Sequence, residues 1–198
     1  MTAHMKGMLA MNILIKNIKM LINGGTPKGD ICISGNKILS AGVIPEGFAA
    51  DKVIDGSDKL AIPGLINCHT HIYSGLARGL AIKGCNPTNF LENLEQQWWK
   101  IDDNLTLDGT KASATALYID SIKQGVTTVF DHHASYGEIP GTLFTISEES
   151  RRLGLRSCLC YEVSDRDGEE KCLQALKENA DFITYCQKQN DPMLAAMF

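Results

Sequence analysis

Pro63-Gly64-Leu65-Ile66-Asn67-Cys68-His69-Thr70-His71 is the stretch that decides the fold, an apolar run that ends in two histidines one residue apart. Successive side chains of a strand point to opposite faces, so His69 and His71 point the same way while Cys68 and Thr70 point away. Neutral imidazole is a favoured ligand of zinc and iron. The motif therefore predicts that His69 and His71 bind one divalent metal, Zn²⁺ in the first place and Fe²⁺ as the alternative.

From residue 61 onward, apolar strands alternate with helical segments, which predicts right-handed βαβ units and a parallel sheet. We expect strands at 61–67, 126–130, 156–163 and 193–198, and helices at 89–101, 108–124, 147–153 and around 173–183. A complete (β/α)₈ barrel uses about 250 residues for eight such units and builds its active site at the carboxyl ends of the strands. The fold class we predict is α/β, a partial (β/α)₈ barrel of about four units, with the histidine pair at the active-site rim.

Residues 1–60 form a separate region of short strands and tight turns. Gly35-Asn36 is typical of a two-residue hairpin, and Asp55-Gly56 marks a further turn. We expect a small antiparallel β unit with modest capacity to bury apolar side chains.

The composition excludes several classes of function. The chain has 198 residues, 19 Lys and Arg against 23 Asp and Glu, and a net charge of −4, so it predicts no nucleic-acid partner. No stretch approaches the roughly 18 apolar residues of a membrane span, and the N-terminus lacks the apolar core of a signal peptide. Seven cysteines without a CxxC pair predict reduced thiols and a cytoplasmic protein.

Further motifs resemble a known family. The chain resembles the amidohydrolase superfamily and, within it, the triazine-hydrolase-like aminohydrolases. The segments that carry this resemblance are Pro63 to His71, 71–79, 89–99, 125–133 and 158–168. The similarity is greatest to the subgroup called SsnA. The resemblance implies that residues 1–60 are the N-terminal part of a composite β-sandwich domain and that 61–198 are the first half of a metal-dependent hydrolase barrel.

The resemblance also implies a reaction. In this family a metal held by the HxH pair, a later histidine and a final aspartate activates a water molecule. The water hydrolyses a non-peptide C–N bond of a small nitrogen-containing, often heterocyclic substrate, and ammonia leaves. Only His69 and His71 match the ligand motif, so the other ligands and the catalytic residues are expected beyond Phe198. We also expect a homo-oligomer.

Several other residues are candidates for contact with substrate or with the metal ligands. Asp131, His132 and His133 end the second barrel strand, where alternation lets only one of the two histidines face the pocket, and packing or helix capping is the alternative role. Glu162, with Asp165 close behind, ends the third strand. Arg78, Trp98 and Trp99 lie in the long connection after the first strand, where the tryptophans could instead pack a helix.

Two alternative functions stay open. Binuclear members of the superfamily carry a carboxylated lysine on the fourth strand, and the absence of lysine from 193–198 favours the mononuclear deaminase type. The chain could also be a truncated, inactive fragment that self-associates or serves as a structural module, because half a barrel leaves an open sheet edge and an uncovered apolar face.

Overall fold

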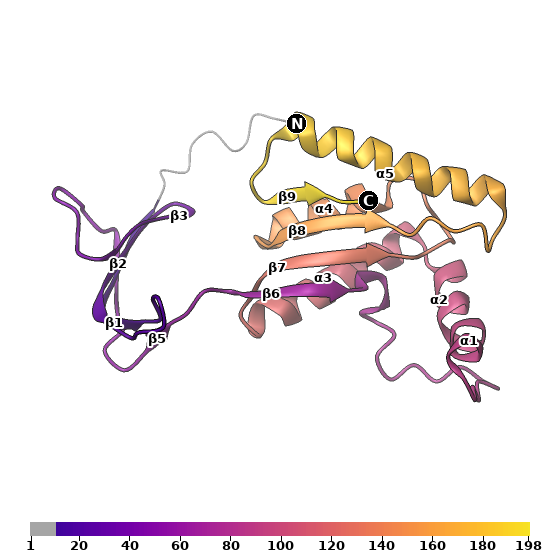
Figure 1. The fold of residues 1–198 in the computed structure, drawn as a ribbon, viewed down its shortest axis with the longest axis horizontal. Coiled ribbons are helices and arrows are strands. Elements are labelled where there is room, and N and C mark those ends of the chain that lie inside the picture. The colour runs from indigo at the N-terminus through magenta and orange to yellow at the C-terminus, as the bar shows by residue number, and fades with distance from the viewer. Residues whose placement is uncertain (1–10) are drawn as a thin grey trace. The chain divides into compact units, whose positions relative to one another are not determined.

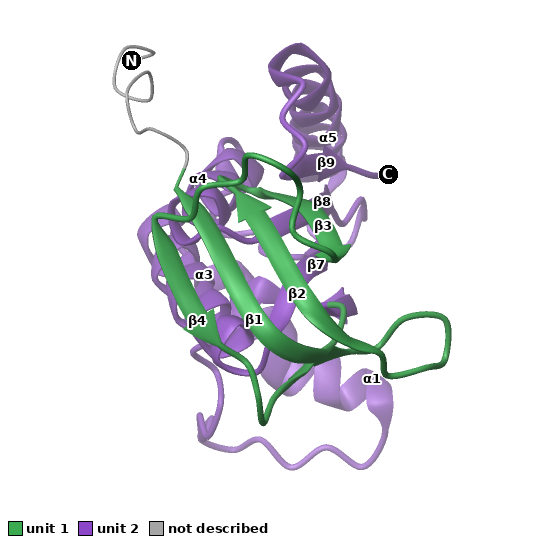
Figure 2. Ribbon diagram, turned by 90° about the vertical axis from the view of Figure 1, so that its left-hand side faces the viewer, with its two compact units in different colours: residues 1–63 green, residues 64–198 purple. Residues whose placement is uncertain are grey.

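The computed structural model describes residues 11–198. Residues 1–10, where the sequence predicts no signal peptide, lie outside the described residues. The chain divides into two compact units that meet between Pro63 and Gly64 (Figure 2). Each unit has its own sheet and its own apolar core.

The first unit is a five-stranded sheet in the order β3-β2-β1-β4, with β5 beside β1. Its strands are β1 (Asn12–Met20), β2 (Lys28–Ser34), β3 (Lys37–Gly42), β4 (Lys52–Asp55) and β5 (Leu60–Ala61). The predicted hairpin is confirmed, since Ser34 pairs with Lys37 across Gly35-Asn36. The antiparallel prediction is wrong for β4 and β5, which run parallel to β1. The reason is that residues 43–51 carry the chain from the end of β3 back to the starting end of β1, where the Asp51 N–H bonds the Asn12 carbonyl group and β4 begins on the far side of β1.

The second unit is an α/β unit built on a four-stranded parallel sheet, as the alternating pattern predicts (Figure 1). Its strands are β6 (Leu65–Thr70), β7 (Val126–His133), β8 (Arg156–Tyr161) and β9 (Leu194–Ala196), and they follow one another in chain order. All four carboxyl ends therefore lie at one rim, where β6 brings the histidine pair.

Helices connect these strands. They are η1 (Ile72–Ser74), α1 (Phe90–Asn93), the π-helical turn η2 (Leu94–Trp98), α2 (Trp99–Asn104), α3 (Leu107–Lys123), α4 (Thr142–Leu153) and α5 (Glu169–Gln189). The Thr106 side chain caps α3 by accepting the N–H of Gly109, and Gly125 follows this helix with φ 79°, a left-handed conformation that favours glycine. Helix α4 begins five residues before the predicted start, because the Glu178 carboxylate accepts the N–H groups of Gly141 and Leu143.

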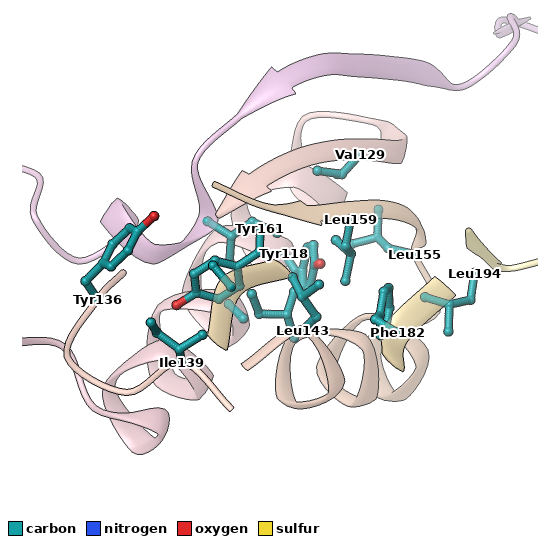
Figure 3. Packing of buried hydrophobic residues seen from close by; sticks show 14 residues of the cluster. Tyr118, Val129, Tyr136, Ile139, Leu143, Leu155, Leu159, Tyr161, Phe182 and Leu194 are labelled. Atoms are coloured by element: carbon teal, nitrogen blue, oxygen red, sulfur yellow. The ribbon is translucent and has the colours of Figure 1, made fainter. Parts of the chain in front are cut away.

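The core of the second unit lies between the sheet and α3, α4 and α5 (Figure 3). Val129, Leu159 and Leu194 point from three strands into it, and Tyr118, Leu143 and Phe182 meet them from the helices. The opposite face of the sheet carries the neighbouring residues along each strand, Phe130, Cys158 and Ala195, which pair with one another. Helices thus cover one face of the sheet, and the rim of the other face is where the histidines lie.

Across the described residues, no helix is both long and apolar enough to span a membrane. All seven cysteines are free thiols.

Candidate functional site

The two histidines of the HxH motif converge on one point. The Nε2 atoms of His69 and His71 are 3.0 Å apart, and their rings stand nearly perpendicular to each other. Nδ1 of His71 lies 2.8 Å from the carbonyl oxygen of His132, which can only accept a hydrogen bond. His71 must therefore carry its proton on Nδ1, so its Nε2 presents a lone pair toward His69.

The turn after the motif is fixed by two buried side chains. Asp131 accepts the N–H of Ile72 through Oδ1 at 2.7 Å, and the Ser113 hydroxyl donates to the carbonyl oxygen of Ile72 at 2.6 Å. Asp131 is fully buried, and this burial raises its pKa to about 8. It therefore acts as an anchor for the backbone beside His71, a role that places it behind the histidine pair and not in the pocket.

The residues of this pair suit a divalent metal but supply only part of a ligand set. Two nitrogen ligands of one zinc ion, each about 2.0–2.1 Å from it, stand about 3.3 Å apart in tetrahedral geometry, close to the observed separation of the Nε2 atoms. Among residues 11–198, no three His, Cys, Asp or Glu side chains are placed to hold one ion. A catalytic zinc ion takes three protein ligands and a water molecule, so this pair alone would fill only two of the protein positions.

The two histidines that end β7 point to opposite faces of the sheet, as alternation predicts. His132 is half-buried and lines the pocket beside His71, with ring centroids 5.6 Å apart. His133 is fully buried between the rings of Tyr73 and Tyr161, and neither ring nitrogen has a hydrogen-bond partner among the described residues. Burial lowers the pKa of His133 to about 3, so it packs as a neutral ring.

A pocket of about 470 Å³ opens beside His71 at this rim. Aromatic and apolar side chains form most of its wall, and two acidic groups and one cation supply its charge. Its lining residues are His71, Tyr73, Ser74, Phe90, Leu94, Trp98, Trp99, Asp102, His132, Ala134, Glu162, Ser164 and Arg166. The structure thus brings Trp98, His132 and Glu162 together with His71.

Arg78 lies apart from this pocket. It lines a second, shallower hollow of about 410 Å³ with His69 and His71, and its guanidinium pairs with Asp120 at 3.0 Å on the exposed surface. An exposed ion pair of this kind contributes little to stability. Arg78 is close to the histidine pair but outside the group that surrounds the larger pocket.

An ion-pair network around Arg166 in the pocket wall was not predicted from the sequence. Nη2 of Arg166 lies 2.8 Å from Oδ2 of Asp102 and 3.3 Å from Oε2 of Glu162. The guanidinium also lies over the rings of Trp99 and Tyr136. Asp102 is 2% exposed, and burial raises its pKa to about 7 although Arg166 opposes that shift. No local pattern could reveal this network, because Asp102 and Arg166 are 64 residues apart.

A model of the amidohydrolase family matches residues 60–195. The chain belongs to the amidohydrolase family. The match covers β6, β7, β8 and all but the last residue of β9, and it includes both histidines of the motif. The family resemblance drawn from the sequence is therefore confirmed.

Two curated deaminases are similar to the chain over most of its length. A 5-methylthioadenosine/S-adenosylhomocysteine deaminase of Pelotomaculum thermopropionicum is 30% identical over 195 residues, which is 94% of this chain and 42% of the relative. A 5′-deoxyadenosine deaminase of Methanocaldococcus jannaschii is 33% identical over 180 residues, 90% of this chain and 39% of the relative. The chain spans about two fifths of the length of the curated relatives it matches.

Solved amidohydrolase structures share the fold at low sequence identity. Atrazine chlorohydrolase from Arthrobacter aurescens TC1, complexed with zinc, matches with a TM-score of 0.72 and 23% identity over 94% of this chain and 46% of its own. An adenosine deaminase from Xanthomonas campestris with bound zinc matches with a TM-score of 0.73 and 17% identity over 95% of this chain and 42% of its own. These likenesses establish the α/β amidohydrolase fold.

Proposed function

We propose that this chain is part of a metal-dependent aminohydrolase and carries its first two metal ligands, His69 and His71, with one wall of its substrate pocket. In this proposal β6 to β9 are the first four strands of a (β/α)₈ barrel, and residues 1–60 belong to a small β-sandwich domain. The observation that carries the proposal is the convergence of the two Nε2 atoms at 3.0 Å, with the tautomer of His71 set by the His132 carbonyl group.

The zinc ions named in two similar structures support Zn²⁺ as the metal, with Fe²⁺ as the alternative. A divalent metal supplies a nucleophile near neutral pH by lowering the pKa of a water molecule. The chain's own residues do the positioning. The His132 carbonyl group orients His71, and Asp131 holds the backbone turn that follows it. The side chain of His132 contributes to the same pocket wall.

The pocket favours a small planar substrate that carries N–H groups. Phe90, Trp98 and Tyr73 offer flat apolar surfaces on which a ring can stack. Glu162 offers carboxylate oxygens that accept hydrogen bonds from amino groups. Relatives named as deaminases of adenosine derivatives, and a similar solved structure named as a triazine hydrolase, support a nitrogen heterocycle as the substrate. The reaction we propose is hydrolytic release of ammonia from such a ring.

Within the family we place the chain in the triazine-hydrolase-like subgroup close to SsnA, on the motifs around His71, Trp98 and Asp131. We propose a mononuclear site, because β9 carries no lysine among Leu194–Ala196. The seven free thiols support a cytoplasmic location.

Zinc titration calorimetry on the 198-residue chain tests the metal assignment. We expect His69→Ala and His71→Ala each to weaken zinc binding at least tenfold, because each removes one of two converging nitrogens. The matched control is His132→Gln, which keeps the carbonyl oxygen that orients His71 and should bind zinc within about twofold of the unchanged chain. Zinc affinity that is equal in all four proteins would refute the assignment.

A further inference from the structure

Glu162 is held at the rim of the second unit by both of its backbone groups. The residue directly follows β8, and its N–H donates to the carbonyl oxygen of His133 at the end of β7. Its own carbonyl oxygen accepts a hydrogen bond from the Tyr136 hydroxyl at 3.0 Å. The point from which the Glu162 side chain leaves the backbone is therefore fixed relative to the pocket wall.

The side chain of Glu162 has one oxygen that is held and one that can meet a ligand. Oε2 accepts a hydrogen bond from Nη2 of Arg166 at 3.3 Å. Oε1 accepts none within the part of the chain that the structure describes, and the side chain is 30% exposed and lines the pocket. An ionised carboxylate accepts hydrogen bonds and donates none. Glu162 thus presents a fixed acceptor to the occupant of the pocket.

Arg166 is engaged too fully to bind a ligand itself. The Nη2 atom that meets Glu162 also donates to Oδ2 of Asp102 at 2.8 Å and to a backbone carbonyl oxygen at 3.2 Å. The guanidinium carbon lies 4.5 Å from the ring centre of Tyr136 and 5.2 Å from that of Trp99, where the aromatic faces attract the cation. Nε and Nη1 are buried. The guanidinium therefore acts on the pocket through the carboxylate that it holds.

We propose that Glu162 determines which substrates the pocket accepts, that Arg166 is its positioning residue, and that the substrate is a nitrogen heterocycle whose ring edge carries an N–H donor. The inference rests on the proposed function, because it takes this pocket as the substrate site. A ring edge with an amino or ring N–H group pairs with Oε1. An edge that carries only lone pairs leaves the carboxylate without a partner, and a site built to bond a donor rejects such analogues strongly.

The two tryptophans of the chain make a direct test possible. Trp98 and Trp99 are its only tryptophans and both line the pocket, so both indole N–H signals in the NMR spectrum of the 198-residue chain come from the pocket wall. The probes are 2-aminopyrimidine and 2-methylpyrimidine, rings of nearly equal shape that are neutral at neutral pH and differ in the donor. We expect 2-aminopyrimidine to bind roughly tenfold more tightly, the effect of one hydrogen bond to a charged group.

Two variants separate the roles of the two residues. Glu162→Gln should abolish the preference, because Arg166 can only donate and so takes the amide oxygen, which turns the amide NH₂ toward the ligand. Arg166→Lys keeps the charge but loses the planar group between the aromatic rings. It should lose most of the preference while its affinity for 2-methylpyrimidine stays within about twofold of the unchanged chain. A purely structural role of Arg166 would weaken both probes alike.

The matched control is Glu95→Gln, which removes an exposed carboxylate of η2 that does not line the pocket. It should keep the full preference for 2-aminopyrimidine. Circular dichroism checks the fold of each variant. If Arg166→Lys fails to fold, Glu162→Asp gives a second reading, because it keeps the charge but draws the carboxylate back from the position in which the guanidinium holds it. This variant should also lose the preference.

Several results would overturn the inference. They are equal binding of the two probes by the unchanged chain, tighter binding of 2-methylpyrimidine, indole signals that neither probe shifts, or a preference that survives in Glu162→Gln or Arg166→Lys. Equal binding in a chain whose zinc affinity depends on His69 overturns the role of Glu162 and leaves the proposed metal site intact. A preference for 2-aminopyrimidine in a chain whose zinc affinity is unchanged by His69→Ala overturns the metal site and leaves the recognition by Glu162 intact.

Discussion

Nδ1 of His71 donates a hydrogen bond to the carbonyl oxygen of His132 across 2.8 Å, so the end of β7 sets the tautomer of the histidine that directly follows β6. The contact joins β6 to β7 at the rim where both strands end. It gives the motif a defined chemical state before any metal arrives, with the Nε2 lone pair of His71 directed toward His69.

This relationship predicts the protonation of His71 in the metal-free chain. Proton–nitrogen correlation spectra of the imidazole rings should show His71 as the Nδ1–H tautomer near pH 8, because only that tautomer can donate to the carbonyl group. His133, which lacks hydrogen-bond partners among the described residues, serves as the internal comparison. A spectrum with the His71 proton on Nε2 would contradict the geometry.

The raised pKa of Asp131 predicts that the folded chain loses stability as the pH rises. Its pKa in the folded protein is raised to about 8 by burial, well above the roughly 3.9 of an unfolded chain. The folded state therefore holds a proton that the unfolded state releases, and the stabilising effect is complete below about pH 4 and lost as the pH rises to about 8. Asp131→Asn, which keeps the acceptor for Ile72, should remove this loss. Urea unfolding of the variant and the unchanged chain between pH 4 and 8 measures the difference.

The lowered pKa of His133 predicts the opposite effect, a loss of stability as the pH falls. Burial lowers its pKa to about 3 in the fold, below the roughly 6.5 of an unfolded chain, so stability is complete above about pH 6.5 and falls as the pH drops toward 3. Between pH 4 and 6.5 the effects of Asp131 and His133 oppose each other. His133→Phe, which retains a ring between Tyr73 and Tyr161, should therefore expose the slope of Asp131 together with that of Asp102, whose pKa is raised to about 7, roughly 1.4 kcal/mol per pH unit for each. An unfolding free energy that stays flat from pH 4 to 6.5 in this variant would count against the assignment.

The buried ion pair between Arg166 and Asp102 predicts a large loss of folding stability when one partner is removed. The side chains of Arg166 and Asp102 are 11% and 3% exposed. Arg166→Met leaves the Asp102 carboxylate without its cation and should destabilise the chain by about 3–5 kcal/mol. The double variant with Asp102→Asn should recover part of that loss, because it removes the stranded charge. Chemical denaturation of both variants checks this, and purely additive effects would show that the two residues are not coupled.

Local patterns in the sequence were sufficient to predict the strand–helix alternation of the second unit. The HxH pair lies at the end of β6, with His71 one residue past the strand, and simple alternation places His132 and His133 on opposite sides of the sheet. The predicted helix at 108–124 corresponds to α3, and Gly125 follows it in a left-handed conformation that favours glycine. These features depend on neighbours within a few residues.

Features that depend on distant residues could not be predicted. Helix α4 starts early because Glu178, 35 to 37 residues further along the chain, caps it. The parallel pairing of β4 with β1 depends on how the hairpin between them folds back. Ser113 holds the carbonyl group of Ile72 from 41 residues away, and nothing in its own segment distinguishes it from other helical serines. Each is a tertiary contact between segments that look ordinary on their own.

The π-helical turn at Leu94–Trp98 has a consequence for how the pocket can change. A π turn is an α-helix with one extra residue inserted, and each residue advances an α-helix by about 100°. Deletion of one residue from this turn would restore the α-helical phase and rotate one end of the segment by that angle relative to the other. Phe90 begins α1 ahead of the turn and Trp98 is the last residue of the turn, so the two side chains could no longer face the pocket together. A change of one residue in length, outside every β-strand, is thus enough to replace the aromatic surface that a substrate meets.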